Sequence, residues 1–107
     1  MTTQIVNRKY DNGAGIEVTF FDKSVTIGKA CTATYNGEPN AFLHSFEVNE
    51  TYRGKGYGTQ ILKYMIDTFN VKTLYVTKDN NAIKLYKRFG FVTVGNFSEN
   101  MLIMQRK

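Results

Sequence analysis

A glycine-rich segment with two basic residues lies in the middle of the chain, between a predicted strand and a predicted helix. It covers residues 53–58 and reads RGKGYG. Glycines before a helix let backbone N–H groups approach a ligand closely, and the first N–H groups of a helix have no partner inside it. The helix dipole, Arg53 and Lys55 add positive charge at the same place. The segment therefore predicts a binding site for an anion, and a phosphate group fits it best.

Two common phosphate-binding loops do not fit this segment. The dinucleotide loop has the spacing G-x-G-x-x-G, whereas Gly54, Gly56 and Gly58 alternate. The nucleoside triphosphate loop needs Ser or Thr after Gly-Lys, whereas Gly56 follows Lys55 here. Both of these site classes are therefore excluded.

The segment resembles instead the pyrophosphate loop of the GCN5-related N-acetyltransferase (GNAT) superfamily. That loop has the pattern Q/R-x-x-G-x-G/A after a strand and at the start of a helix, and Arg53, Gly56 and Gly58 occupy its specified positions. Residues 79–91 are similar to the superfamily's second motif, N-x-x-A-x-x-L-Y-x-x-x-G-F. The two motifs stand in the expected order, and the similarity covers residues 41–107.

One position of the second motif departs from the superfamily. The motif's asparagine falls on Asp79, whereas its other specified residues all match. A carboxylate cannot donate the hydrogen bond that a carboxamide donates. We therefore assign no cofactor contact to Asp79. Asn80 or Asn81 would make that contact instead, and Asn81 is the residue that we select as the candidate.

The resemblance implies an N-acetyltransferase that uses acetyl-CoA as its acyl donor. In this superfamily the pyrophosphate docks on the glycine loop, the pantetheine arm pairs with the backbone of the preceding strand, and an amine attacks the thioester directly. A backbone N–H near Phe46 would polarise the thioester carbonyl. The implied cofactor-binding residues are Phe46, Val48, Arg53, Gly54, Lys55, Gly56, Tyr57, Gly58, Thr59 and Asn81.

Two residues are candidates for proton transfer. Tyr86 stands at the second motif's tyrosine, which in this superfamily commonly protonates the departing CoA thiolate; the alternative is an aromatic packing residue. His44, the only histidine, lies on the strand that enters the glycine loop, where several members place a general base. A single histidine on an apolar strand face is equally often a packed residue. Glu47 is a weaker candidate, because strand alternation places it on the face opposite His44.

Hydrophobic patterns predict the elements that position these residues. Alternating segments over residues 4–35 predict an antiparallel meander, with hairpin turns at Asn12-Gly13 and Asn36-Gly37. Ala41–Val48 is the next predicted strand, with Phe42, His44, Phe46 and Val48 on one face.

The second half of the chain predicts a strand, helix, strand unit. Residues 57–70 carry a helical apolar stripe, and residues 72–77 read as a strand parallel to the one before the glycine loop. Residues 79–81 supply the N-cap of a short helix over residues 82–89, and two strands at 91–94 and 101–105 follow, joined by a loop at 95–100. The predicted fold class is α/β (α+β), a GNAT-like fold with a mostly antiparallel mixed sheet, a central parallel βαβ unit and two main helices.

Length and composition limit the possibilities. The 107 residues form one predicted domain, residues 1–107, and 42% hydrophobic residues indicate a folded globule. No apolar run is long enough to span a membrane, and the first residues show no signal peptide, so we expect a cytoplasmic protein. The single Cys31 has no cysteine to pair with and no cluster that suggests metal.

The charge is uneven along the chain. Residues 1–50 hold four Lys or Arg and six Asp or Glu, whereas residues 51–107 hold ten and three. A basic half suits a polyanionic cofactor, and it equally suits nucleic acid. The alternatives to an enzyme are therefore a non-catalytic acyl-CoA-binding domain and a small nucleic-acid-binding domain, neither of which is favoured.

The only indication of the kind of acceptor amine is that the predicted helices which usually cover the acceptor site are missing. Superfamily members usually begin with a strand and one or two helices that cover the acceptor site, whereas residues 1–40 show no helical periodicity. An open site favours an amine on a protein or another macromolecule. A second copy of the chain could supply the missing wall, so both a monomer and a homodimer fit the sequence.

Overall fold

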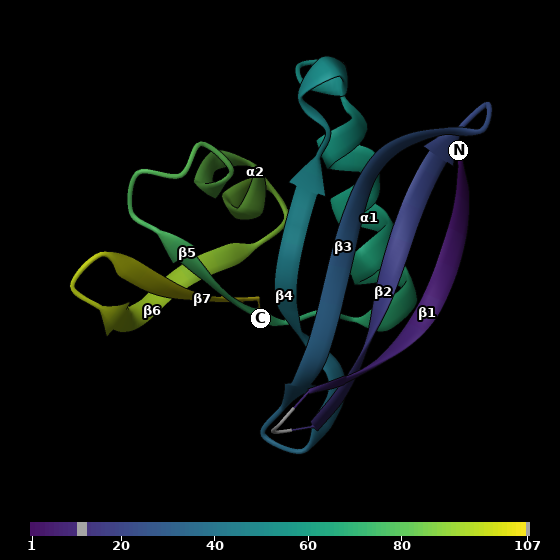
Figure 1. Cartoon of the computed structure of the whole chain (residues 1–107). Helices are drawn as coiled ribbons and strands as arrows, with labels where there is room; N and C mark the ends of the chain where they lie inside the picture. The colour runs from purple at the N-terminus through teal and green to yellow at the C-terminus, as the bar shows by residue number, and fades with distance from the viewer. Residues whose placement is uncertain (11–12, 107) are drawn as a thin grey trace. The chain divides into compact units, whose positions relative to one another are not determined.

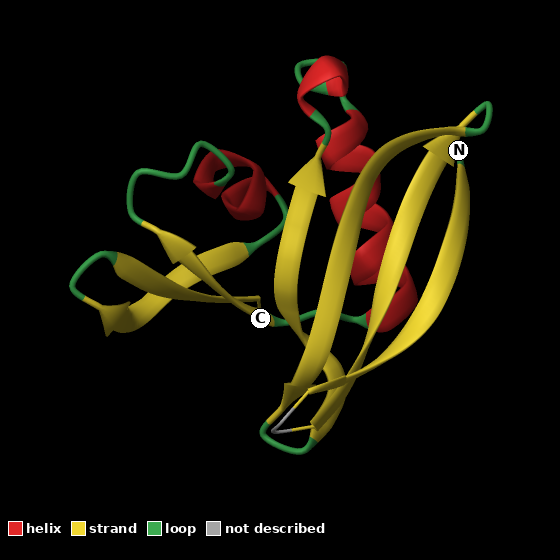
Figure 2. Ribbon diagram, viewed as in Figure 1, coloured by secondary structure: helices red, strands yellow, loops and turns green. Residues whose placement is uncertain are grey.

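Strands dominate both halves of the chain. The computed structural model describes residues 1–10 and 13–106, and these fall into two compact units, Met1–Val71 and Lys72–Lys107 (Figure 1). Seven strands, two α-helices and one short 3-10 turn make up the described part (Figure 2). None of the described helices has the length and apolarity needed to cross a membrane.

The first unit is an antiparallel meander followed by a helix. Its strands are β1 (Thr2–Tyr10), β2 (Gly13–Asp22), β3 (Val25–Tyr35) and β4 (Glu38–Val48). Each strand pairs antiparallel with the next, which confirms the predicted meander. Asn36 and Gly37 both have positive φ, as the predicted turn requires, whereas Asn12 of the predicted Asn12-Gly13 turn lies outside the described residues.

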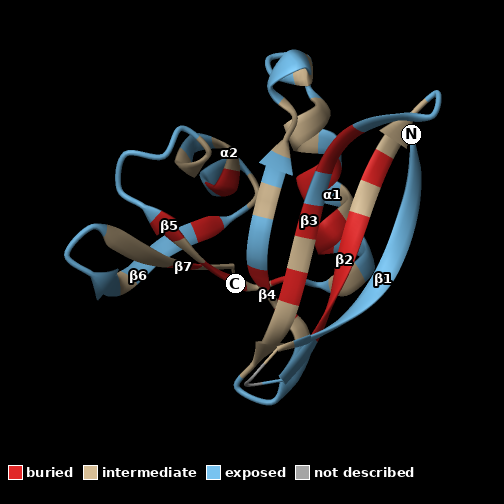
Figure 3. Ribbon diagram, in the orientation of Figure 1, coloured by how far each residue is buried: buried red, intermediate tan, exposed pale blue. Residues whose placement is uncertain are grey.

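One face of this sheet is covered by α1 (Tyr57–Phe69), which confirms the predicted helix. The apolar stripe of α1 is fully or almost fully buried, and red segments on β2, β3 and α1 mark the core in Figure 3. Burying each such side chain contributes about 2 kcal/mol. The core residues of the helix are Ile61, Leu62, Met65 and Ile66.

Asn70 ends α1. It adopts the left-handed conformation, with φ of 56°, and its N–H donates to the carbonyl of Ile66. This is the geometry of a helix C-cap, and asparagine tolerates it better than other non-glycine residues. The chain then reaches Val71, which is completely buried.

The second unit holds three strands and a short helix. Its elements are β5 (Thr73–Thr77), α2 (Ile83–Arg88), β6 (Phe91–Ser98) and β7 (Met101–Arg106). β7 pairs antiparallel with both β5 and β6. The order β4, α1, β5 along the chain is the predicted strand, helix, strand order.

The predicted loop at residues 95–100 is wrong for most of its length. β6 continues to Ser98, because two irregularities in its register, at Val94 and Phe97, keep it paired with β7 across Gly95 and Asn96. The Phe97 ring stacks on Tyr75 of β5 at a centroid distance of 4.5 Å. Pairing and stacking therefore override the weak strand preference of Gly95 and Asn96.

Gly28 provides a test of the close approach between β3 and its neighbours. A Cβ at this position would lie 2.4 Å from the carbonyl oxygen of Glu47 and 3.1 Å from Cδ1 of Ile61, whereas a Cβ on Gly95 would meet nothing within 4 Å. We expect Gly28→Ala to destabilise the protein by roughly 1–3 kcal/mol, since backbone must move. Gly95→Ala is the matched control and should be neutral or slightly stabilising. Urea unfolding midpoints measure both, and equal midpoints would contradict the packing at Gly28.

Candidate functional site

Two residues of the glycine loop have positive φ, and both are glycines, which adopt this conformation without strain. Gly54 has φ of 76° and Gly56 has φ of 84°, a region that side-chain-bearing residues rarely adopt. Gly56 is the N-cap of α1, and no side chain caps this end of the helix. A Cβ on either glycine would meet nothing within 4 Å, so space lies open above the backbone. The first turn of α1 thus presents N–H groups to an open surface, as an anion site requires.

The basic side chains of the loop are partly held by the protein. The Nε of Arg53 donates to the carbonyl oxygen of Val48 at 2.8 Å, which ties the loop to the end of β4. The Nζ of Lys55 lies 5.7 Å from the centre of the Tyr52 ring, a cation–π contact. This bond uses Nε of Arg53 and leaves the two Nη groups of the guanidinium out of it.

Tyr57 anchors the start of α1 to the end of β2. Its hydroxyl donates to Oδ2 of Asp22 at 2.8 Å, and its ring contacts Tyr52 edge to face. This hydrogen bond raises the pKa of Tyr57, because the carboxylate partner favours the neutral phenol. Asp22 was missed by sequence reasoning. No local signal links it to a loop 35 residues away.

The strand that precedes the loop contains a bulge. Cys31 pairs with Ser45 and Thr32 pairs with Leu43, so His44 is the extra residue of β4. Beyond the bulge, Phe46 lies opposite the buried Ala30, on the same face as Leu43.

The predicted face assignment of β4 is therefore wrong. Strict alternation placed Phe42, His44, Phe46 and Val48 together, but one inserted residue reverses the alternation beyond it. Phe46 and Val48 share the face that packs toward α1, whereas Phe42 and Glu47 belong to the other face.

His44 is exposed and stacks on an aromatic ring. Its ring and that of Tyr10 are 5.0 Å apart and nearly parallel. Burial is the main cause that raises the pKa of Tyr10, followed by Cys31 beside it. The two rings and the thiol therefore form one cluster on β1, β3 and β4. His44 is thus exposed, with a ring stack as its contact, and its role as a general base stays a prediction.

Glu17 is a buried carboxylate in the same unit. It is 6% exposed and forms ion pairs with Arg8 and with Lys29, the latter at 2.8 Å. Two cations around one carboxylate offset the cost of its burial. Among residues 1–10 and 13–106, no cluster of three or more His, Cys, Asp or Glu side chains could hold a metal ion.

Tyr86 lies in the second unit, on α2. It is 6% exposed, and its ring meets that of Phe91 edge to face at 5.9 Å. Burial raises the pKa of Tyr86 to about 12, because a phenolate would be poorly solvated there. The phenol therefore keeps its proton at neutral pH.

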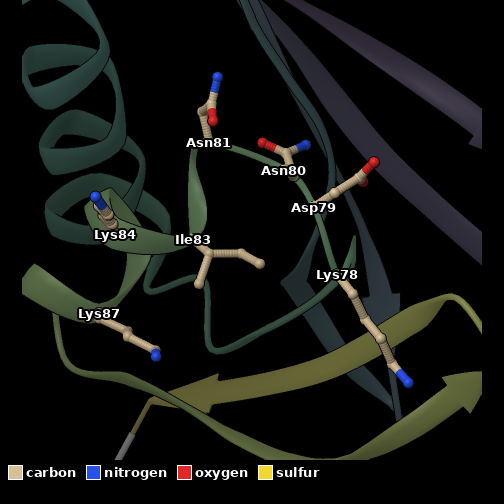
Figure 4. A pocket seen from close by; sticks show the side chains of 7 residues that line it. All are labelled: Lys78, Asp79, Asn80, Asn81, Ile83, Lys84 and Lys87. Atoms are coloured by element: carbon tan, nitrogen blue, oxygen red, sulfur yellow. The ribbon is translucent and has the colours of Figure 1, made fainter.

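The loop before α2 differs slightly from the prediction. Ala82 is the N-cap and its side chain makes no cap bond; instead Oδ1 of Asn80 accepts a hydrogen bond from the Ala82 N–H at 2.8 Å. Asp79 and Asn81 are exposed. Asn81 lines a cavity with its neighbours, and Figure 4 shows its carboxamide extending from the loop.

The predicted site residues thus fall into two groups. The first unit holds Phe46, Val48 and residues 53–59, which it brings together at the end of β4 and the start of α1. His44 lies on the same strand. Tyr86 and Asn81 belong to the second unit.

A family model for the acetyltransferase (GNAT) family matches residues 4–91, most of the chain. The chain belongs to this family. The match includes the glycine loop and reaches the end of the second motif. It confirms the resemblance that the two motifs indicated.

Curated and structural relatives agree with this membership. Spermine/spermidine N(1)-acetyltransferase of Bacillus subtilis (strain 168) is 36% identical over 72 residues, which are 61% of this chain and 47% of the relative. The chain thus spans about half the length of the curated relatives that it matches.

Solved structures of this family share the fold. Ard1 from Thermoplasma volcanium has a TM-score of 0.71 at 24% identity, with 84% of this chain and 68% of that chain covered. A GNAT family acetyltransferase from Elizabethkingia anophelis with acetyl-CoA bound has a TM-score of 0.69 at 19% identity, with 87% and 76% covered. The predicted fold class is therefore confirmed.

Tyr86 generates a prediction for alkaline pH. Because its pKa is raised from 10.0 to about 12, the folded state binds the phenolic proton more tightly than the unfolded chain does. This contribution to stability is complete below pH 10 and is lost as the pH rises towards 12. Relative to Tyr86→Phe, the free energy of unfolding of the wild type should fall by at most roughly 3 kcal/mol over this range. Urea titrations at each pH test this, and parallel curves for the two proteins would contradict it.

Proposed function

We propose that this protein is an N-acetyltransferase that transfers the acetyl group of acetyl-CoA directly to an amine, with residues 1–107 acting as one acetyltransferase domain. The observation that carries this proposal is the glycine loop. Its two positive-φ glycines and uncapped helix start occur at the pyrophosphate position of a family to which the chain belongs. Relatives solved with coenzyme A or acetyl-CoA support the same donor.

The first unit would hold the donor. Backbone N–H groups of residues 56–59 and the charges of Arg53 and Lys55 would bind the pyrophosphate. The bond from Arg53 to Val48 supports this role, because it holds the arginine beside the loop before any ligand arrives. The pantetheine arm would pair with the backbone of Phe46–Val48.

The reaction needs one bond to form and one to break. The amine nitrogen attacks the thioester carbon, the C–N bond forms, and the C–S bond breaks to release the CoA thiolate. The nitrogen loses a proton and the sulfur gains one. The protein therefore has to hold both reactants close, polarise the carbonyl and handle two protons.

Tyr86 and His44 are the residues that we assign to the protons. With a pKa of about 12, Tyr86 is protonated at neutral pH and can donate to the departing sulfur. His44 is exposed at a bulge, where its ring is accessible to a water or to an amine, and the stack on Tyr10 limits its orientations.

Two classes of amine are candidates for the acceptor of the acetyl group. An amine on a protein or another macromolecule is the first class, and it stays the expectation from the lack of helical periodicity in residues 1–40. The curated Bacillus relatives are named for spermine and spermidine, which supports a small polyamine. Release of CoA in the presence of spermidine or of a lysine-containing peptide separates these classes.

Donor binding gives the first test of this function. A ligand that binds only the native state raises its stability by RT ln(1 + [L]/Kd), about 2.7 kcal/mol at a hundredfold excess over Kd. Acetyl-CoA should therefore raise the Tm of the wild type and leave that of Arg53→Glu almost unchanged. Lys9→Glu, an equal charge reversal on the exposed β1, is the control and should keep the shift. No shift in the wild type would refute the proposed function.

Proton transfer gives the second test. Tyr86→Phe should lower kcat by about 10²-fold with little change in the Kd of acetyl-CoA, because a general acid acts only in the reaction. His44→Gln should lower kcat with little change in the Kd of acetyl-CoA, because a general base also acts only in the reaction. Unchanged rates with either variant would remove that residue from the mechanism. A wild type that binds acetyl-CoA but acetylates no amine would favour the non-catalytic alternative.

A further inference from the structure

The Tyr10 side chain lies on the face of the first sheet that is turned away from α1. Phe20 of β2 contacts Tyr64 of α1 edge to face, so the even-numbered residues of β2 point toward the helix. Gly13 and Gly15 therefore belong to the opposite face. Tyr10 pairs with Gly13 across β1 and β2, and paired residues share a face.

Gly15 leaves the room that the Tyr10 ring occupies. A Cβ at Gly15 would lie 2.9 Å from a carbon of this ring, closer than real Cβ atoms come to a neighbour. It would also lie 1.9 Å from the carbonyl oxygen of Thr32, so a Gly15 variant would move the backbone and makes a poor test. The ring thus leans across β2, and its hydroxyl forms a hydrogen bond with the Cys31 side chain of β3. Tyr10 is therefore held by a strand that is not adjacent to its own (Figure 1).

His44 needs such a support because of its place in β4. It is the extra residue of the bulge, so no residue of β3 lies opposite it to fix the direction of its side chain. Its ring and the Tyr10 ring lie 5.0 Å apart, with 23° between their planes. Within residues 1–10 and 13–106, no other ring contact, hydrogen bond or ion pair involves the His44 side chain. The orientation of the imidazole therefore depends on Tyr10.

We propose that Tyr10 is a positioning residue for His44: its ring, carried across β2 over Gly15, holds the imidazole in one orientation. This inference rests on the proposed function, in which His44 takes the proton of the acceptor amine. An exposed imidazole has several staggered orientations, and a general base must lie within hydrogen-bond reach of the proton that it accepts. The stack selects among these orientations before the amine arrives, and misplacing a reacting group by about 1 Å can cost up to about 10²-fold in rate.

Substitutions at position 10 test this role by kinetics. Tyr10→Leu removes the ring and should lower kcat about tenfold. The Kd of acetyl-CoA should stay unchanged, which also shows that the variant is folded. Tyr10→Phe keeps the ring and should keep kcat close to that of the wild type. Tyr35→Leu is the matched control, because it removes a ring from another stacked pair of the same sheet, and it should leave kcat unchanged.

A double variant connects the two residues. Tyr10→Leu/His44→Gln should be as slow as His44→Gln and no slower, because a positioning residue has no effect once the group that it positions is gone.

Proton NMR gives a readout that does not depend on catalysis. His44 is the only histidine of the chain, so its imidazole C–H signals in the untagged protein are assigned without ambiguity. The ring current of a stacked aromatic ring should displace these signals from those of a free imidazole in the wild type, Tyr10→Phe and Tyr35→Leu. The displacement should be lost in Tyr10→Leu.

The outcomes separate this inference from the proposed function. In an active wild type, an unchanged kcat for Tyr10→Leu or a double variant slower than His44→Gln would overturn the positioning role alone. Equal losses in Tyr10→Leu and Tyr10→Phe would assign the effect to the hydroxyl and would overturn it as well, as would His44 signals that do not move in Tyr10→Leu. A wild type that acetylates no amine would overturn the proposed function and the positioning role together.

Discussion

Burial of the α1 apolar stripe against the first sheet places the glycine loop. Ile61, Leu62 and Met65 are completely buried, so α1 can neither rotate nor slide without exposing them. Its first turn is therefore held at the end of β4, where the chain must reverse in a few residues. The positive φ of Gly54 and Gly56 makes this reversal possible. The position of the proposed anion site thus follows from the way the core is packed.

Side-chain hydrogen bonds then hold that loop in a fixed shape. Asp22 accepts from Tyr57, and Arg53 donates to the Val48 carbonyl. Asn49 adds a third connection, since its Nδ2 donates to the carbonyl of Thr26 at 2.9 Å. Each bond is modest by itself, about 1 kcal/mol. Together they restrain the N–H groups before a ligand binds, and such pre-organisation reduces the entropy that binding costs.

The two halves of the chain carry opposite net charges. The acidic excess of residues 1–50 includes Glu17, which is neutralised by Arg8 and Lys29, and Asp22, which supports the loop. The basic excess of residues 51–107 includes Arg53 and Lys55 of the glycine loop. The uneven charge is therefore consistent with the phosphate site proposed at the glycine loop, which composition alone could not distinguish from a general basic surface.

Local patterns in the sequence determined the meander, the two helices, the glycine loop and the family. Alternation, helical periodicity, Asn36-Gly37 and the glycine spacing act within a few residues, so they can be read without knowing the partners. Tertiary structure alone decided the bulge at His44, the extension of β6 to Ser98, the partner of Tyr57, and the burial that raises the pKa of Tyr86 to about 12. Each of these depends on which strand or side chain lies opposite, and that is set by packing between residues far apart in the sequence.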